Sequence, residues 1–391
     1  MLKLPYRIDR GARSEEYCTK EAPRPCRKGV SAEVGAVEGA CWQLGIRSAL
    51  LSQKCGGLSS RLHNQTEDLD RIAFLSYLFV FLIQLTSSPS GGRMETKMKK
   101  TVFTGAATAI VTPLTKDGID YEQFARLIEW QITEGIDAIV AVGTTGEGST
   151  LTDDEHKEAI RFCVEQVAGR VPVIAGTGSN DTAYAIELTQ YACKVGADAM
   201  LLVTPYYNKA TQRGLIETFR TIADASDKPC ILYNVPSRTG CNLLPASCAV
   251  LADHPNIVAI KEACGNISQV AELAALVGDK MDIYSGNDDQ IVPILSLGGK
   301  GVISVLSNIM PKKTSEMCRL FMNGDVAASR KLQLDLLPLI DALFCEVNPI
   351  PVKAAVSAMG MCENYLRLPL TKMEPEHEAK LLALMREQNL I

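Results

Sequence analysis

Short apolar runs alternate with longer helical patterns from residue 101 onward, and this alternation constrains the fold more than any other feature of the 391-residue chain. The runs are rich in β-branched and other apolar residues and lack polar alternation, which is typical of strands buried on both faces of a parallel sheet. Eight such runs are present: Gly105–Val111, Asp137–Val142, Val171–Ala175, Asp198–Val203, Cys230–Tyr233, Ile257–Ile260, Met281–Tyr284 and Gly301–Val305.

The segments between these runs carry helix signals. Thr152 and Glu155 have the spacing of a capping box before a helix over His156–Val167, and a polar Asn-Asp-Thr stretch precedes a second helix over Ala183–Lys194. Eight strands that alternate with helices predict an α/β protein with a (β/α)8 TIM barrel. A doubly wound open sheet is the alternative. Residues 311–391 are rich in helix formers and poor in strand patterns, so we expect a C-terminal helical appendix there.

Charge and periodicity divide the chain near residue 97. Residues 1–97 hold 14 Lys and Arg against 10 Asp and Glu, whereas the rest has a net charge of −9. The first segment also shows no sustained helix or strand period. We therefore predict three segments: an N-terminal extension at 1–97, a catalytic barrel at 98–310 and a helical region at 311–391.

The N-terminal extension has one conspicuous feature, the apolar run Ile72–Thr86. Its 15 residues are fewer than the ~20 that a membrane-spanning helix needs, and it lies too deep in the chain for an ordinary secretory signal. A membrane anchor is the less favoured alternative. We expect the extension to be unstructured, or the true start to be Met94 or Met98.

Composition excludes several classes of function. Hydrophobic residues make up 47% of the chain and charged residues 22%, as in an ordinary globular protein. The net charge of −5 gives no electrostatic case for a nucleic-acid partner. The 13 cysteines include no Cys-x-x-Cys pair and the four histidines lie far apart, so no metal site is expected. Scattered single cysteines in an enzyme-sized chain favour a reduced, cytoplasmic protein.

In a barrel of this kind, catalytic residues lie at the C-terminal ends of the strands. Lys261 follows the run Ile257–Ile260, so we expect its amine to be buried in the barrel mouth. Burial lowers the pKa of a lysine, and the neutral amine is the form that attacks a carbonyl to give an imine. The alternative is a structural lysine paired with an acid such as Glu262.

Other strand ends add polar groups to the same rim. The Gly-Thr-Thr-Gly-Glu loop at 143–147 precedes a helix, and its amides and hydroxyls make a site for a carboxylate or phosphate. The absence of a phosphate-loop lysine favours a carboxylate. Tyr207 and Tyr233 offer phenols that move protons, and Arg238 offers a bidentate donor for a second carboxylate.

Several of these motifs together resemble one known family. They are GTTGE at 143–147, VTPYYN at 203–208, ILYNVPSRTG at 231–240, IKEA at 260–263, GVISV at 301–305 and NPIPVK at 348–353. In this order they closely resemble the 4-hydroxy-tetrahydrodipicolinate synthase (dihydrodipicolinate synthase) family of the pyruvate-dependent aldolase superfamily. The resemblance runs from about residue 98 to residue 391 and leaves residues 1–97 out.

The resemblance implies a catalytic role for four residues. Lys261 is expected to form a Schiff base with pyruvate, and Tyr233 to move protons during imine formation. Thr144 and Tyr207 are expected to complete a proton relay, with Tyr207 reaching into the active site of a neighbouring subunit. A homo-oligomer follows from this, a dimer being the smallest complete unit and a dimer of dimers the common assembly of the family.

The resemblance also implies how the two substrates bind. Thr145 and the loop amides are expected to hold the pyruvate carboxylate, and the backbone of Ile303 to line the same pocket. Arg238 is expected to receive the carboxylate of L-aspartate 4-semialdehyde. No metal or organic cofactor is implied. The alternatives are a sugar-acid lyase of the same superfamily, such as N-acetylneuraminate or 2-keto-3-deoxy-sugar-acid lyase, and a catalytically silent binding protein.

Feedback inhibition by lysine is where this chain departs from the family. The positions expected near the effector are compatible with lysine binding: Ser149, His156, Asn180 and Tyr206. Tyr184, however, stands where the family usually has a glutamate that faces the lysine ammonium. We therefore expect weak or absent inhibition by lysine.

Overall fold

The eight apolar runs form eight parallel strands that close into a barrel. The computed structural model describes residues 99–391. The strands follow the order β1-β10-β9-β8-β7-β6-β5-β4, and β1 pairs with β4 to close the ring. Their bounds are β1 Gly105–Ala109, β4 Ala138–Ala141, β5 Val173–Gly176, β6 Ala199–Val203, β7 Cys230–Asn234, β8 Ile257–Glu262, β9 Asp282–Ser285 and β10 Gly301–Ser304. The barrel prediction is confirmed, and closure excludes the open sheet.

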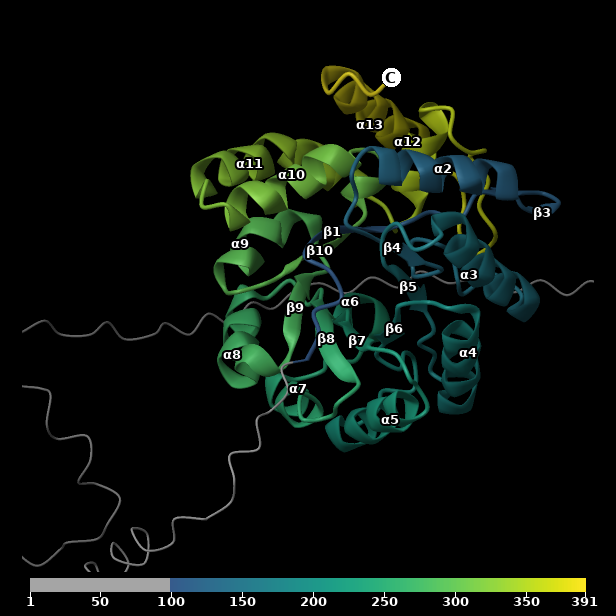
Figure 1. Ribbon diagram of the computed structural model, residues 1–391. Coiled ribbons are helices and arrows are strands. Elements are labelled where there is room, and N and C mark those ends of the chain that lie inside the picture. The colour runs from purple at the N-terminus through teal and green to yellow at the C-terminus, as the bar shows by residue number, and fades with distance from the viewer. Residues whose placement is uncertain (1–98) are drawn as a thin grey trace, which may run out of the picture. The chain divides into compact units, whose positions relative to one another are not determined.

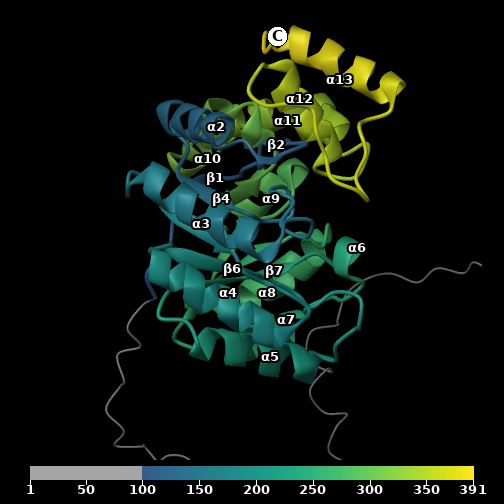
Figure 2. The ribbon, with the colours of Figure 1, turned by 90° about the vertical axis from the view of Figure 1, so that its right-hand side faces the viewer.

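A helix follows each barrel strand, and the first seven of these helices return the chain to the start of the next strand. Figure 1 shows these helices around the strands, and Figure 2 shows the arrangement turned by 90°. They are α2 Tyr121–Thr133, α3 Asp153–Val167, α4 Thr182–Val195, α5 Gln212–Asp224, α7 Pro245–Leu251, α8 Ile267–Val277, α9 Ile291–Ser296 and α10 Pro311–Met322. Short elements occupy the connections: the hairpin of β2 Leu114–Thr115 and β3 Gly118–Ile119, the helix α6 Pro236–Thr239, and the 3-10 turns η2 Gly278–Lys280, η3 Asp288–Gln290 and η4 Leu306–Asn308.

The predicted start of α3 is a complete capping box. The Thr152 hydroxyl accepts a hydrogen bond from the Glu155 amide at 3.3 Å, and the Glu155 carboxylate accepts one from the Thr152 amide at 2.9 Å. Asp181 caps α4 by accepting from the amide of Ala183 at 3.0 Å. Each cap satisfies helix amides that have no partner inside the helix and is worth about 1 kcal/mol.

The barrel separates two apolar cores. One core lies between the strands and the surrounding helices and includes buried residues such as Phe124 and Phe219. The other fills the barrel interior. Phe103, just before β1, stacks on Tyr284 at 4.2 Å between ring centres, and the Tyr284 hydroxyl donates to the Phe103 carbonyl oxygen at 2.7 Å. This pair closes the barrel interior beside the start of β1. The mouth at the C-terminal ends of the strands is therefore the end that can hold a site.

Three further helices follow the barrel: α11 Val326–Leu343, α12 Ile350–Ala358 and α13 Pro375–Glu387. They confirm the predicted C-terminal helical region. The first helix after residue 310, α10, packs against β1 and β10 and so occupies the place of the eighth barrel helix. The division at residue 310 stays a prediction. Residues 1–97, with the run Ile72–Thr86, lie outside the described residues. Within 99–391, no helix combines the length and apolar character needed to cross a membrane.

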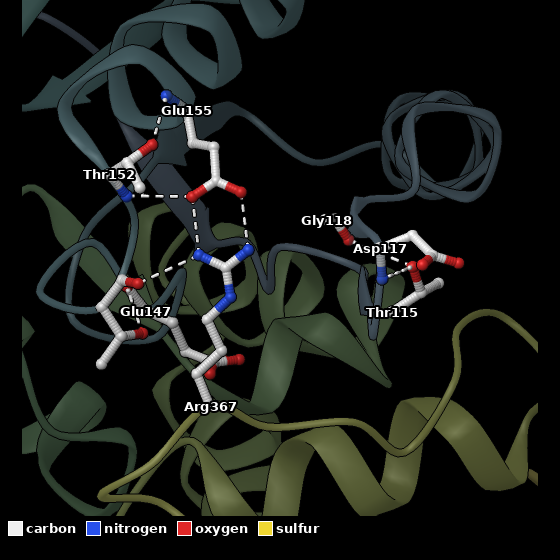
Figure 3. A network of polar contacts seen from close by, with 8 residues as sticks. Thr115, Asp117, Gly118, Glu147, Thr152, Glu155 and Arg367 are labelled. Atoms are coloured by element: carbon white, nitrogen blue, oxygen red, sulfur yellow. Dashed lines mark hydrogen bonds and ion pairs between the residues drawn. The ribbon is translucent and has the colours of Figure 1, made fainter.

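An arginine links the C-terminal segment to the start of α3. Arg367, between α12 and α13, donates to both carboxylate oxygens of Glu155 at 2.6 Å and to the Thr150 carbonyl oxygen at 3.0 Å (Figure 3). The hydrogen bonds from Arg367 hold the pKa of Glu155 at about 2. The Glu155 carboxylate also completes the capping box, so its contact with Arg367 fixes the end of the connection between β4 and α3.

Candidate active site

Lys261 lies near the C-terminal end of β8 and is buried, with 6% of its surface exposed. It pairs in register with Tyr233 of β7, and its Nζ lies 4.3 Å from the centre of the Tyr233 ring. Side chains of neighbouring strand residues point to opposite faces. Glu262 accordingly bonds elsewhere, accepting from Asn234 Nδ2 at 3.0 Å and from the Cys264 amide at 2.8 Å. The structure thus gives Glu262 other partners than Lys261.

Burial lowers the pKa of Lys261 from 10.5 to about 7. The carboxylate of Asp288 acts against this and raises the pKa, whereas the Arg238 cation lowers it further. The amine has room because residue 286 is glycine: a Cβ there would lie 2.7 Å from Ala263 Cβ and 3.1 Å from Lys261 Cε. A large fraction of Lys261 is therefore neutral near pH 7, the form that attacks a carbonyl.

Tyr233 keeps its proton at neutral pH. Burial raises the pKa of its phenol above 10, although the charge of Arg238 and a hydrogen bond with Thr144 pull it down. The phenol lies beside the Lys261 amine, so it is placed to give a proton to a developing alkoxide and to take one back.

The loop at 143–147 holds the two threonines against the barrel mouth. Thr145 is 2% exposed, and its Oγ1 accepts a hydrogen bond from Asn348 Nδ2 at 3.0 Å. The Thr112 hydroxyl donates to the Gly146 carbonyl oxygen at 2.7 Å. The loop is therefore tied both to the segment after β1 and to the C-terminal helical region.

A fully buried ion pair anchors the end of this loop. Glu147 Oε1 and Lys353 Nζ lie 2.8 Å apart, and neither side chain has any exposed surface. Lys353 comes from α12 and also donates to the Thr112 carbonyl oxygen at 2.6 Å. Such a pair is costly to break, because either partner alone is a buried charge.

Arg238 lies on α6, the short helix after β7. Its Nη2 donates to the main-chain carbonyl oxygen of Asn348 at 3.0 Å. One residue of the C-terminal region thus contacts Arg238 with its backbone and Thr145 with its side chain.

Two adjoining cavities open around these groups. The smaller, of about 140 Å³, is lined by five of the seven predicted site residues: Thr144, Thr145, Tyr233, Arg238 and Lys261. The larger, of about 400 Å³, shares Thr144, Tyr233 and Arg238 with it. The structure therefore brings together the amine, the phenol, the threonine loop and the arginine.

Tyr207 and Ile303 line neither cavity. Tyr207 is 88% exposed and has a left-handed backbone with a φ of 76°, which is strained for a tyrosine. Ile303 is fully buried on β10, in register with Ala107, and the residue of this segment that lines the smaller cavity is Val305. The roles expected for Tyr207 and Ile303 stay predictions.

Several residues that line the smaller cavity were not predicted to belong to the site. Asn348 is the main one, and Gly286, Asn287 and Phe344 are others. Asn348 belongs to the NPIPVK motif, which carried the family resemblance but gave no sign of contacts with residues about 110 and 200 positions earlier.

The larger cavity contains most of the positions expected near a lysine effector: Ser149, His156, Tyr184 and Tyr206. Asn180 lies beside it and donates to the Tyr206 carbonyl oxygen at 3.4 Å. The Tyr184 hydroxyl donates to Asp153 Oδ1 at 2.8 Å, and burial together with this bond raises the pKa of Tyr184 to about 12. No Asp or Glu of the described chain lines this cavity.

Comparison with known proteins agrees with this geometry. The model of the Dihydrodipicolinate synthetase family matches residues 102–388, which is most of the chain. The chain belongs to this family. It is 58% identical over 284 residues to the 4-hydroxy-tetrahydrodipicolinate synthase of Lachnoclostridium phytofermentans, covering 72% of this chain and 96% of that one. It is 55% identical over 294 residues to the synthase of Acetivibrio thermocellus, covering 75% and 100%.

A solved structure gives the same result. The chloride-inhibited dihydrodipicolinate synthase from Acinetobacter baumannii complexed with pyruvate is 44% identical, with a TM-score of 0.73, over 74% of this chain and 100% of that chain. Both relatives and the solved structure match about three quarters of this chain, which agrees with the resemblance beginning near residue 98.

Proposed function

We propose that this protein condenses pyruvate with L-aspartate 4-semialdehyde to give 4-hydroxy-tetrahydrodipicolinate. The observation that carries the proposal is the buried Lys261 amine, with a pKa of about 7, beneath the Tyr233 phenol in a cavity that Arg238 and Thr145 also line. A reactive amine, a proton donor and two carboxylate-binding groups are the parts that this reaction needs.

Imine formation begins at Lys261. Its neutral amine attacks the keto carbon of pyruvate, and the phenol of Tyr233 protonates the oxygen so that it leaves as water. The protonated imine then acts as an electron sink. The Tyr233 phenolate left by the loss of water takes a proton from the pyruvate methyl group, and the resulting enamine is the carbon nucleophile of the next step.

Carbon–carbon bond formation follows. The enamine attacks the aldehyde carbon of the second substrate, whose carboxylate is held by Arg238 as a bidentate pair. The substrate's own amine then attacks the imine carbon, closes the ring and releases the Lys261 amine for another cycle. Every bond is made and broken by groups of the two substrates and of this chain.

The second substrate distinguishes this reaction from that of a sugar-acid lyase. A sugar acid needs hydroxyl-binding groups along a chain of several carbons, whereas an arginine suits a short anionic aldehyde. We therefore expect the rate with L-aspartate 4-semialdehyde to exceed the rates with N-acetylneuraminate and 2-keto-3-deoxy sugar acids by several orders of magnitude. Steady-state assays with each substrate test this, and a higher rate with a sugar acid would overturn the proposal.

We also propose that the protein works as a homo-oligomer in the cytoplasm, with Tyr207 acting in the site of a neighbouring subunit. The exposure and strained backbone of Tyr207 support this, because an isolated surface tyrosine gains nothing from such a conformation. Mixing two inactive variants, Tyr207→Phe and Lys261→Met, tests it. Subunit exchange should restore activity, since one site of a mixed dimer has both residues intact. Without recovery in dimers shown to be mixed, the role of Tyr207 fails.

A further inference from the structure

Asn348 joins the two carboxylate-binding groups of the site. Its main-chain carbonyl oxygen accepts from Arg238 Nη2 at 3.0 Å, and its side-chain Nδ2 donates to Thr145 Oγ1 at 3.0 Å. The residue is 5% exposed and lines the cavity that holds Lys261. It therefore has a fixed position between the loop that follows β4 and the helix α6 that follows β7, although it comes after α11 in the chain.

The bond to Thr145 decides what the threonine hydroxyl does. A hydroxyl has one proton to donate and two lone pairs. Because Asn348 Nδ2 donates to Oγ1, the Thr145 proton is not used on Asn348 and remains for another acceptor. Thr145 lines the cavity beside Lys261, so that acceptor lies in the substrate site.

The orientation of the Asn348 amide agrees with this assignment. Its Oδ1 is buried and has no hydrogen-bond partner among residues 99–391. The flipped amide would let Oδ1 accept the Thr145 proton but would leave the NH2 group facing away with two unmet donors. Buried donors without partners are rarer than buried acceptors without partners. The observed orientation is the better of the two, and it keeps the threonine proton available.

We propose that Asn348 is a positioning residue, which makes Thr145 an obligatory hydrogen-bond donor to the carboxylate of the keto acid. This inference rests on the proposed function and names a determinant of its specificity. A carboxylate presents one acceptor oxygen to the Thr145 hydroxyl and the other to the loop amides, whereas the amide of the keto acid has a single acceptor oxygen, so in either orientation its NH2 group faces a donor. The site should therefore reject pyruvamide, in which NH2 replaces one carboxylate oxygen.

The test compares the rates at which pyruvate and pyruvamide form an imine on Lys261, measured by reductive trapping and intact mass. Wild type should prefer pyruvate. Asn348→Leu and Thr145→Val should each reduce this preference by about 10-fold, the effect of losing one hydrogen bond to a charged group. The double variant should lose no more than Thr145→Val alone, because Asn348 acts through the threonine hydroxyl. Multiplied losses would contradict the inference, as would an unchanged preference in Asn348→Leu.

Two further variants separate positioning from folding. Asn348→Asp keeps the side-chain shape but replaces the donor by an acceptor, so its preference for pyruvate should fall at least as far as that of Asn348→Leu. Asn323→Leu is the matched control, because it makes the same change at the exposed end of α10, outside both cavities. It should leave the preference within about 2-fold of wild type. An equal loss in the control would show that Asn348 is not the determinant.

The trapping experiment distinguishes failure of this inference from failure of the proposed function. If wild-type Lys261 gains no mass from pyruvate, the proposed function fails. If Lys261 traps pyruvate and the preference over pyruvamide does not depend on Asn348, only the inference about Asn348 fails. The main-chain bond to Arg238 is independent of the side chain, so these variants leave the second carboxylate site in place.

Discussion

The pH dependence of imine formation tests the electrostatics of Lys261. With a pKa of about 7, half of the amine is neutral at pH 7, against roughly one part in 3,000 for an ordinary lysine at 10.5. The value of kcat/KM for pyruvate should rise with pH and level off above about 8. Tyr233 does not interfere, because the pKa of its phenol lies above 10.

Replacing Asp288 by asparagine should move this profile in a predictable direction. The Asp288 carboxylate raises the pKa of Lys261 because it stabilises the ammonium form. Its Oδ2 accepts from the amides of Val305 and Leu306, both at 2.9 Å, and an asparagine oxygen can keep these bonds. Asp288→Asn should therefore lower the pKa of Lys261 by about one unit, the usual effect of one nearby charge.

The assay is kcat/KM for pyruvate between pH 5 and 9, because this parameter reports ionisations of the free enzyme. The matched control is Asp289→Asn, the same change at the exposed neighbouring residue, which is not among the charges that shift Lys261. Its midpoint should stay within about 0.3 units of wild type. A shift of the Asp288→Asn midpoint toward alkaline pH would refute the reasoning, as would a wild-type midpoint above 9.

Three further predictions concern stability and regulation. Glu147→Gln should reduce the free energy of unfolding, measured in urea, by about 3–5 kcal/mol, because it leaves Lys353 as an unpaired buried cation. Adding Lys353→Met to this variant should recover most of the lost stability. Additive losses in the double variant would contradict the pairing. Lys261→Met should raise the thermal unfolding temperature, more at pH 6 than at pH 9. The free-energy cost of burying the Lys261 ammonium has its full value below the folded-state pKa of about 7 and disappears as the pH approaches 10.5. A larger rise in unfolding temperature at pH 9 than at pH 6 would therefore have the wrong sign. L-Lysine below 1 mM should inhibit the wild-type enzyme little in a titration of activity against lysine. Tyr184→Glu should be about 10-fold more sensitive to inhibition by lysine in the same titration. Strong inhibition of the wild type would overturn this prediction.

The barrel could be predicted from sequence because its strands are buried on both faces. All eight apolar runs became strands, with ends within about two residues of those expected. The helix start at Thr152 followed from capping chemistry, which is local. The hairpin of β2 and β3 was not predicted, since strands of two residues carry no period.

Five site residues could be predicted because parallel strands bring their C-terminal ends to one rim. The position of Asn348 could not, since it depends on how the C-terminal helices pack against the loop at 143–147 and against Arg238. The role proposed for Tyr207 involves a second copy of the chain, which sequence periodicity does not describe.

The most direct test of the central claim is to trap the imine. Wild-type protein is incubated with pyruvate, reduced with borohydride, digested and analysed by mass spectrometry, beside Lys261→Met treated in the same way. We predict that wild type gains the mass of one reduced pyruvate per chain on the peptide containing Lys261, and that the variant gains none. Absence of the adduct in wild type, or its presence on another lysine, would contradict the account.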